Sequence, residues 1–431
     1  MDNAENKWFR SRGYLHFDAP VKLENAKKIV KFPDVVAKHA FLPLIQYDIY
    51  SFKVSVDDNG KLTKTKKSRN ISYASHIDSH IYSYYSEKLS VFYENKLSDA
   101  SLHNSILAFR ALSKSNIDFA NDAFEKIKTH GNCVAIAMDI SGFFDNLDHK
   151  TLKDMWNKVL DTSVLPDDHY NIFKSLTKFS QVKRDVLFET LNLPRNNPHK
   201  IGRRLCDIKT FRDKVRGSKI ITSNIKQKGI PQGTSISALL SNIYMLDFDS
   251  KVKVFITSLG GHYYRYCDDM LFIVNPEHQA ITTETIIELI SKLKIEINPK
   301  KTETRNFYMN GGVQKCDKPL QYLGFTFDGE RKLIRSAALA KFSGRMKSGV
   351  RLAKKNHAKA NLLEEEIGIL KTPLFKRKIY ERYSHLGKKN FITYGHMAAK
   401  TMKSKAIKKQ LKPLWNRLTK EIEASLKVGH E

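Results

Sequence analysis

Residues 266–269 read Tyr266-Cys267-Asp268-Asp269 and interrupt a largely apolar run over residues 263–274. Two adjacent carboxylates within such a run predict a tight β-hairpin with both acids at its turn, because burial of apolar surface alone does not place charges there. An isolated pair of aspartates is more often a solvated turn. The rest of the chain distinguishes between these interpretations.

A third carboxylate, Asp139, follows the apolar strand predicted for residues 133–138. If the fold brings this strand beside the hairpin, three oxygen donors meet. Mg²⁺ prefers oxygen ligands in near-octahedral geometry, and two ions about 3.5 to 4 Å apart suit an in-line displacement at phosphorus. The three acids therefore predict a two-metal site for nucleotidyl transfer.

The chain is strongly basic. Its 431 residues carry a net charge of +29 and a pI near 9.7, which indicates a polyanionic partner, first of all nucleic acid. The charge is concentrated, since residues 331–431 contain 26 lysines and arginines against seven acids, a net +19. With 41% hydrophobic residues, the chain is long enough for two or three compact subdomains.

Other features exclude several classes of protein. No apolar stretch approaches the roughly 18 residues needed to span a bilayer, and the first residues lack the apolar core of a signal peptide. A cytoplasmic protein without a membrane partner is expected. The four cysteines are far apart and form no CxxC pair, which predicts reduced thiols rather than a zinc site or a disulfide framework.

The pattern of apolar residues predicts an α+β fold. Residues 52–56 and 61–69 form a hairpin pattern with turn residues at 57–60, and residues 76–96 form a long helical pattern. From residue 134 strands and helices alternate, which suits a split βαβ core. Helices are predicted at 150–160, from 234, and at 282–293.

Beyond residue 336 the pattern is helical and cationic. A three-helix domain is the economical interpretation, with Pro373 in a first turn and Gly387 at a helix end. A solvated basic helix face is the alternative, but so much like charge repels itself unless a partner neutralises it.

Five short segments surround these features in a fixed order. They are MDISGFFD (138–145), GIPQGT (229–234), YCDD (266–269), NPKKT (298–302) and YLGF (322–325). In sequence and order they resemble the palm motifs of reverse transcriptases, over about residues 130–330. The resemblance implies a right-hand polymerase with fingers at 1–130, a palm at 131–335 that has a finger-like insertion at about 166–228, and a helical basic thumb at 336–431.

The same resemblance assigns the catalytic centre. It implies that Asp139, Asp268 and Asp269 hold two Mg²⁺ ions, with Mn²⁺ as a substitute, and it includes Ile140 among the metal-binding residues. Lys301 matches a lysine near the triphosphate and is a candidate proton donor to the pyrophosphate leaving group. An ordinary exposed lysine is the alternative at this position.

The nucleotide and the primer have their own implied contacts. Phe144 matches the steric gate that crowds a ribose 2′-hydroxyl and so favours deoxynucleotides. Gln232 and Gly233 are expected beside the templating base pair, because glycine permits close backbone approach and the glutamine amide reaches backbone or base edges. The primer grip is expected at Tyr322, Leu323, Gly324 and Phe325.

Basic residues of the fingers are expected to bind the incoming triphosphate, because arginine engages phosphate in a bidentate manner. The candidates are Lys66, Lys67 and Arg69 on the predicted return strand, and Arg110 further along. Arg69 is the first choice.

The flanks narrow the branch of the family. About 100 residues follow the last motif, enough for a thumb but too few for a ribonuclease H or endonuclease domain. The segments RGYLHFD (12–18), ISYASHID (71–78) and NIDFA (116–120) resemble bacterial defence-associated and abortive-infection reverse transcriptases, in particular the second defence-associated type. That type copies a structured noncoding RNA into complementary DNA in antiphage defence.

Three alternatives stay open. One is a template-independent or protein-primed DNA polymerase of the abortive-infection type. Another is a retron-like enzyme, disfavoured because the Asn-Ala-x-x-His and Val-Thr-Gly signatures are absent. The third is an RNA-binding scaffold without catalysis, disfavoured because all three aspartates are present. The sequence leaves protein partners, oligomeric state, the RNA template and the priming group undefined.

Overall fold

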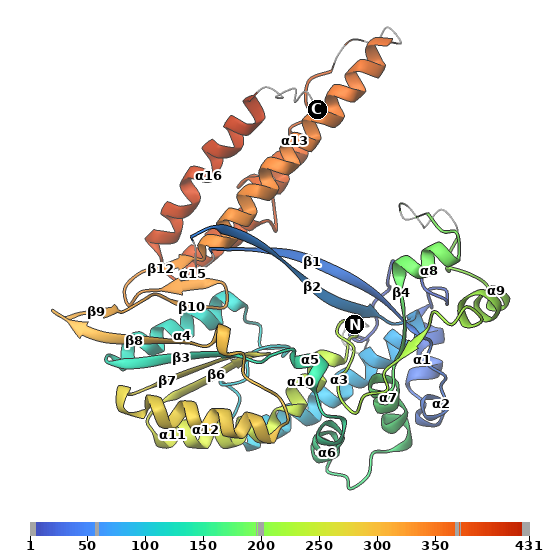
Figure 1. Ribbon diagram of the computed structural model, residues 1–431, viewed down its shortest axis with the longest axis horizontal. Helices are drawn as coiled ribbons and strands as arrows, with labels where there is room; N and C mark the ends of the chain where they lie inside the picture. Colours follow the sequence, from blue (N-terminus) through green and yellow to red (C-terminus); the bar gives the residue numbers. More distant parts are fainter. Residues whose placement is uncertain are drawn as a thin grey trace.

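The computed structural model describes residues 6–56, 60–194, 196, 202–366, 370 and 372–424. Figure 1 displays a body of mixed sheets and helices from which a pair of long helices, α13 and α16, rises on one side. A long two-stranded hairpin, β1 and β2, extends from the opposite side toward the base of those helices. The fold combines helices with antiparallel and mixed sheets and belongs to the α+β class predicted from the sequence.

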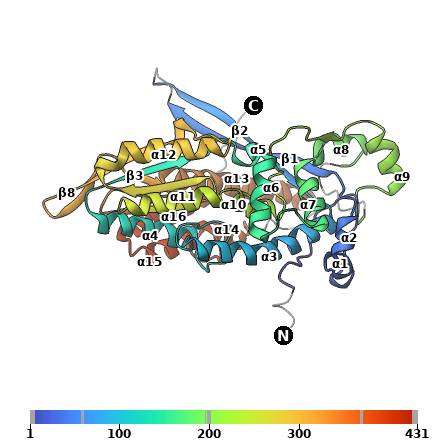
Figure 2. The ribbon, with the colours of Figure 1, turned by 90° about the horizontal axis from the view of Figure 1, so that it is seen from below.

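The hairpin joins β1 (Leu44–Val56) to β2 (Leu62–Tyr73) in antiparallel register, which confirms the hairpin predicted from residues 52–69. Of its predicted turn, residues 57–59 lie outside the described residues. Figure 2 shows the far end of the hairpin projecting clear of the rest of the body. The flanking helices are α1 (Leu23–Val30), α2 (Pro33–Ala37) and α3 (His76–Asp99).

A segment from the middle of the chain completes this small sheet. Strand β4 (Ser180–Lys183) runs parallel to β1, and β5 (Thr222–Ser223) pairs with β4, which gives the order β2-β1-β4-β5. The predicted insertion at about 166–228 thus contributes strands to the sheet of the long hairpin. Its helical parts are α7 (Asp167–Thr177), α8 (Arg184–Thr190), α9 (Ile208–Thr210) and the π-helix η2 (Phe211–Arg216).

The central sheet is five-stranded and antiparallel, in the order β6-β7-β3-β8-β9. Its strands are β3 (Cys133–Asp139), β6 (His262–Tyr266), β7 (Asp269–Val274), β8 (Glu303–Asn310) and β9 (Val313–Cys316). The helices associated with this part of the chain are α4 (Asn116–His130), α5 (Phe143–Asn146), α6 (His149–Leu160), α10 (Ser237–Tyr244), α11 (Leu246–Ser258) and α12 (Gln279–Lys292). Short 3-10 turns occur at η3 (Pro276–His278) and η4 (Pro299–Lys301).

Alternation along β3 separates two hydrophobic cores, because successive side chains of a strand point to opposite faces. Val134, Ile136 and Met138 pack into the core that includes α10, α11 and α12. Cys133 and Ala135 pack into a second core. It is completed by α4, by a small sheet within residues 320–334 and by the helices beyond residue 336. Each face of the central sheet is therefore covered.

That small sheet consists of β10 (Leu320–Tyr322), β11 (Phe325–Phe327) and β12 (Lys332–Ile334). The C-terminal region then contains four helices in the part that the structure describes: α13 (Ser336–Glu366), α14 (Arg377–Tyr383), α15 (Phe391–Thr401) and α16 (Lys405–Glu423). The prediction of three helices was wrong. Pro373 lies before α14 rather than in a first turn, and the helix expected to reach Gly387 ends at Tyr383.

All four cysteines are free thiols. Among the described residues, no helix combines the length and apolarity needed to cross a membrane.

Candidate active site

The centre of the site is a pair of carboxylates on neighbouring strands. Asp139 ends β3 and Asp269 begins β7, and the two residues are direct partners in the antiparallel register. Along the two strands, both aspartates alternate in step with Leu271 and Ile273, so all four side chains are on one face of the sheet. Leu271 and Ile273 pack into the core shared with the C-terminal helices. Both aspartates therefore belong to that face of the sheet.

Backbone hydrogen bonds fix the end of β3 beside the turn that carries Asp268. The amide of Ile140 donates to the Asp268 carbonyl at 3.2 Å, and the amide of Asn298 donates to the Asp139 carbonyl at 2.7 Å. These bonds bring together the first, third and fourth of the sequence segments described above. Lys301 completes the group, because its ammonium nitrogen pairs with the Asp139 carboxylate.

The turn between β6 and β7 contains a strained residue. Cys267 has φ of 60°, a left-handed conformation that a cysteine adopts only at a cost. Arg265 supports this turn, since its guanidinium donates to the Cys267 carbonyl at 3.1 Å. The same guanidinium pairs with Asp249 of α11, and both side chains are fully buried.

Arg265 is the residue that the sequence interpretation missed. Its guanidinium also contacts Asn242 of α10 at 3.0 Å, and Asp249 accepts a further hydrogen bond from the Tyr263 hydroxyl at 2.7 Å. The available signal was an arginine inside an apolar strand two residues before the acidic turn, because a buried charge needs a partner.

The acidic group has the chemistry of a metal site. Desolvation and the negative charges of Asp268 and Asp139 raise the pKa of Asp269 to about 6, although the residue as a whole is exposed. As the side chains stand, the described residues contain no group of three or more histidine, cysteine or acidic side chains arranged around one ion position. Crowded oxygen donors whose charges repel one another nevertheless fit hard divalent cations, which would neutralise that repulsion.

Comparison with known proteins decides the family. Residues 57–327, well over half of the chain, match the model described as "Reverse transcriptase (RNA-dependent DNA polymerase)". The chain belongs to the reverse transcriptase family. This match covers the carboxylates, Lys301 and the other predicted site residues, and it bears out the resemblance seen in the motifs. No curated protein sequence matches the chain.

Solved structures similar to this reverse transcriptase include telomerases of two yeasts. Telomerase from Candida albicans, in complex with a fragment of telomeric RNA, has a TM-score of 0.42 and 11% identity over 94% of this chain and 66% of that one. Apo telomerase from Candida tropicalis has a TM-score of 0.41 and 12% identity over 94% and 71%. Apo telomerase from Candida tropicalis truncated from its C-terminal domain has a TM-score of 0.40 and 11% identity, over 72% of this chain and 59% of that one. The chain thus spans about three fifths to seven tenths of these telomerase chains.

Gln232 and Gly233 lie against strand β2 of the long hairpin. The Gln232 carbonyl accepts a hydrogen bond from the Ser72 amide of β2 at 2.8 Å. Gly233 has φ of +118°, and a Cβ there would lie 2.6 Å from the Ser72 carbonyl oxygen and 2.9 Å from a methyl of Ile71. Only glycine allows this approach. Both residues therefore lie where β2 meets the segment that precedes α10.

The predicted basic residues of the hairpin lie on two different faces. Lys66 is paired with Phe52, and its ammonium lies 3.7 Å from the centre of the Tyr50 ring. Lys64 lies in the same way 4.3 Å from the centre of the Phe52 ring. This face, which we call the outer face, carries exposed aromatic rings beside lysines.

Arg69 and Lys67 belong to the opposite face, because side chains alternate along β2. The side chain of Ile71 lies on the same face, and one of its methyl groups would be 2.9 Å from a Cβ at Gly233. Arg69 is exposed. The alternation therefore places Arg69 on the same side of the hairpin as Ile71, and Lys66 on the outer face.

Arg110 does not join this group. Its guanidinium makes a bidentate pair with Glu94 of α3, at 2.8 and 2.6 Å, and also donates to the carbonyls of Ile106 and His103. Only 1% of the side chain is exposed. We therefore correct the expected triphosphate role of Arg110 to a structural one.

The remaining predicted residues lie on both sides of the carboxylates. Phe144, in α5, is half-buried and packs at 5.8 Å from the Phe143 ring. Leu323 and Gly324 form the turn between β10 and β11, each with positive φ, as two-residue hairpins favour. The Leu323 carbonyl accepts a hydrogen bond from Asn116 of α4.

The outer parts of the predicted primer grip are buried. Phe325 packs in the core shared with the C-terminal helices, and Tyr322 is 4% exposed. The negative charge of Asp269 contributes to the raised pKa of Tyr322, after the larger effect of burial. Of the four residues of the predicted primer grip, only Leu323 and Gly324 are accessible to solvent.

The raised pKa of Asp269 gives a pH-dependent prediction. A divalent cation bound by these acids needs the Asp269 carboxylate, so the affinity of the site for added Mg²⁺ should fall roughly fourfold between pH 7.5 and pH 5.5, as a proton occupies a group of pKa about 6. In the metal-free protein the same shift should lower stability as the pH rises from about 4 through 6, because the folded state holds the proton more tightly than the unfolded state. Calorimetric Mg²⁺ titrations from pH 5 to 8 measure the first effect, and an affinity that stays constant over this range would contradict it.

Proposed function

We propose that this reverse transcriptase is an RNA-directed DNA polymerase that copies a structured noncoding RNA into complementary DNA in antiphage defence. The observation that carries the polymerase activity is the placement of Asp139 directly opposite Asp269, with Asp268 in the adjoining turn. The defence role rests on the segments at 12–18, 71–78 and 116–120. The division into fingers at 1–130, palm at 131–335 and thumb at 336–431 is part of the same proposal.

The chain supplies the surroundings for nucleotidyl transfer. Asp139, Asp268, Asp269 and the backbone of Ile140 would hold two Mg²⁺ ions, or Mn²⁺ in their place. When bound, the metals lower the pKa of a primer 3′-hydroxyl and offset charge on the leaving pyrophosphate. Lys301 donates a proton to that pyrophosphate from an ammonium already beside Asp139.

Other residues of the chain position the deoxynucleoside triphosphate and the primer. Arg69 contacts the triphosphate from the hairpin, and Gln232 and Gly233 lie against the templating pair. The turn at Leu323 and Gly324 holds the primer end. Each of these residues orients a reactant rather than reacting with it.

The thumb supports binding of a nucleic-acid template. A groove of about 1140 Å³ lies in this domain. Helix α13 forms one wall, and α14 together with the loop that follows it forms the other. Its basic residues are Lys341, Arg345, Lys378, Arg382, Lys388 and Lys389. None of the six pairs with an acidic side chain in the part of the chain that the structure describes. Such a groove suits RNA phosphates.

The test is to purify the protein from cells that carry its native flanking DNA and to sequence the bound RNA and DNA. We expect one abundant RNA and matching complementary DNA, with the DNA absent from the Asp268→Ala, Asp269→Ala double variant. The same variant should lose protection against phage. Protection without DNA synthesis would contradict the proposal, and DNA of low complexity would instead indicate the untemplated or protein-primed alternative.

Substitution of Phe144 tests the preference for deoxynucleotides. Phe144→Ala should raise ribonucleotide incorporation relative to deoxynucleotide incorporation by about ten- to hundredfold, because the ring no longer crowds the 2′-hydroxyl. Phe144→Tyr keeps the ring and should keep the preference. Single-nucleotide primer extension measures both, and an unchanged ratio in Phe144→Ala would exclude Phe144 as the gate.

A further inference from the structure

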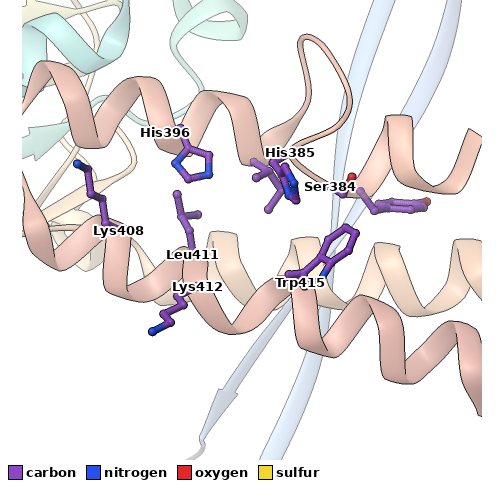
Figure 3. Close-up of a pocket in the computed structure, with 9 residues that line it drawn as sticks. Ser384, His385, His396, Lys408, Leu411, Lys412 and Trp415 are labelled. Atoms are coloured by element: carbon purple, nitrogen blue, oxygen red, sulfur yellow. The ribbon is translucent and has the colours of Figure 1, made fainter. Parts of the chain in front are cut away.

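A second cavity lies in the thumb, separate from the basic groove. It has a volume of about 490 Å³ and lies among α15, α16 and the segment that follows α14 (Figure 3). This size is within the range of about 300 to 1000 Å³ that is usual for small-ligand sites. None of the residues assigned above to polymerisation contributes to it.

The interior of this thumb cavity is apolar and aromatic. Leu411 and Ile392 are buried residues of its lining, and Trp415 and Tyr383 are half-buried ones. Trp415 is held by a stack with the ring of Tyr380, with centroids 5.7 Å apart and an interplanar angle of 28°. A fixed indole that borders a cavity is a platform on which a planar group can stack.

The exposed side chains of the lining are basic or imidazole groups. They are Lys408, Lys412, His385 and His396, and no acidic residue is among the described residues that line the cavity. Lys408, Leu411, Lys412 and Trp415 follow one another at helical spacing along α16, so the lysines and the indole share one face. In Figure 3 the ring of His385 lies close to that of Trp415, and His396 approaches from α15. The centroids of the His385 and Trp415 rings are 5.0 Å apart.

One residue joins this thumb cavity to the basic groove. Tyr383 lines both of them. Its position is fixed by Gly349 of α13, where a Cβ would come within 2.1 Å of the tyrosine hydroxyl. A strand whose phosphates follow the groove can therefore place a neighbouring nucleotide on the other side of Tyr383.

We propose that the thumb cavity binds one unpaired nucleotide of an RNA strand, with its base against Trp415 and its phosphate near Lys408 and Lys412. The aromatic interior suits a base and the cationic side chains suit a phosphate, which is the combination that single-stranded nucleic acid offers. A paired base is excluded, because its faces are already covered by its neighbours in the helix. The inference rests on the proposed function only in that the chain binds RNA.

Photochemical crosslinking provides the first test. The wild-type chain is irradiated with a single-stranded oligouridylate that contains 5-bromouridine, and peptides that carry a nucleotide adduct are identified by mass spectrometry. We expect the adduct at Trp415. An adduct confined to other residues would overturn the proposal. So would an RNA that gives no adduct at Trp415 while free uridine monophosphate binds there.

Affinity measurements provide the second test. Trp415→Leu should weaken binding of the same RNA by about tenfold, because the stacking platform is lost, whereas Trp415→Phe should restore most of it. Lys412→Ala should weaken binding about threefold and reduce the steepness of the salt dependence. Lys420→Ala, an exposed lysine two turns further along α16, should change neither. Equal affinities for Trp415→Leu, Lys412→Ala and wild type would refute the site.

Two measurements keep the test independent of folding and of polymerisation. Lys412 is exposed, so its replacement tests the site even if Trp415→Leu lowers the melting temperature. DNA synthesis on a primed homopolymer is measured in parallel. If the wild-type protein binds RNA but makes no DNA, the proposed function alone is contradicted. If the wild-type protein makes DNA but Trp415→Leu binds RNA as tightly as wild type, the thumb site alone is contradicted.

Discussion

Asp139→Asn should lower the rate of nucleotide addition by about a thousandfold or more while the protein stays folded. Asp139 is the carboxylate opposite Asp269, and replacing it with a neutral amide removes a charged oxygen from the donor set. Stabilisation by the metals is worth several kcal/mol, and about 4 kcal/mol corresponds to this factor. Stability should change by less than about 1 kcal/mol, because Lys301, the lost partner, is 45% exposed.

The measurement is single-turnover primer extension at saturating Mg²⁺, with thermal unfolding in parallel. Asp154→Asn is the matched control, since it makes the same charge change on the exposed face of α6 and should leave the rate unchanged. A rate for Asp139→Asn within tenfold of wild type would show that this carboxylate is not essential to the chemistry.

Arg265→Met should lower the free energy of unfolding by about 3 to 5 kcal/mol, the largest stability effect that we expect from a single substitution. The substitution leaves Asp249 without its cation in a fully buried position. It also removes the hydrogen bond to the Cys267 carbonyl, so the strained turn that carries Asp268 loses its support. Nucleotide addition should therefore slow even where the protein is still folded.

Urea unfolding gives the stability change. Arg377→Met is a matched control, because the Arg377–Glu381 pair is exposed and should contribute less than about 1 kcal/mol. The double variant Arg265→Met, Asp249→Leu should recover much of the lost stability but not the lost rate, since the turn still lacks its hydrogen bond. Equal losses for Arg265→Met and Arg377→Met would contradict the buried role.

The parts of the fold that depend on strict local patterns could be predicted from the sequence. The strand before Asp139 and the hairpin at 266–269 each have an apolar pattern that ends in a charge, and antiparallel pairing of the two places the charges together. Lys301 followed from its motif, and the structure brings it to Asp139.

The parts that were mispredicted depend on long-range partners. Nothing near Arg110 in sequence reveals that Glu94, sixteen residues earlier, holds its guanidinium. The number of C-terminal helices depends on where α14 and α15 find apolar neighbours. Strongly basic helical segments contain few apolar residues, so their sequence gives little indication of where one helix ends and the next begins. The two faces of the hairpin were predictable in principle, because a period of two already separates Lys66 from Arg69.

The long hairpin also determines how its sequence can change. Residues 64 and 66 of β2 carry the outer face, and residues 67 and 69 carry the face on the side of Gly233. Substitutions at even-numbered positions therefore change the outer face and leave the face on the side of Gly233 as it was. The two faces of one strand can diversify under separate selective pressures. Insertion or deletion of a single residue is different, because it exchanges the faces of everything beyond it. Point changes should thus be tolerated in this strand far more readily than changes in its length.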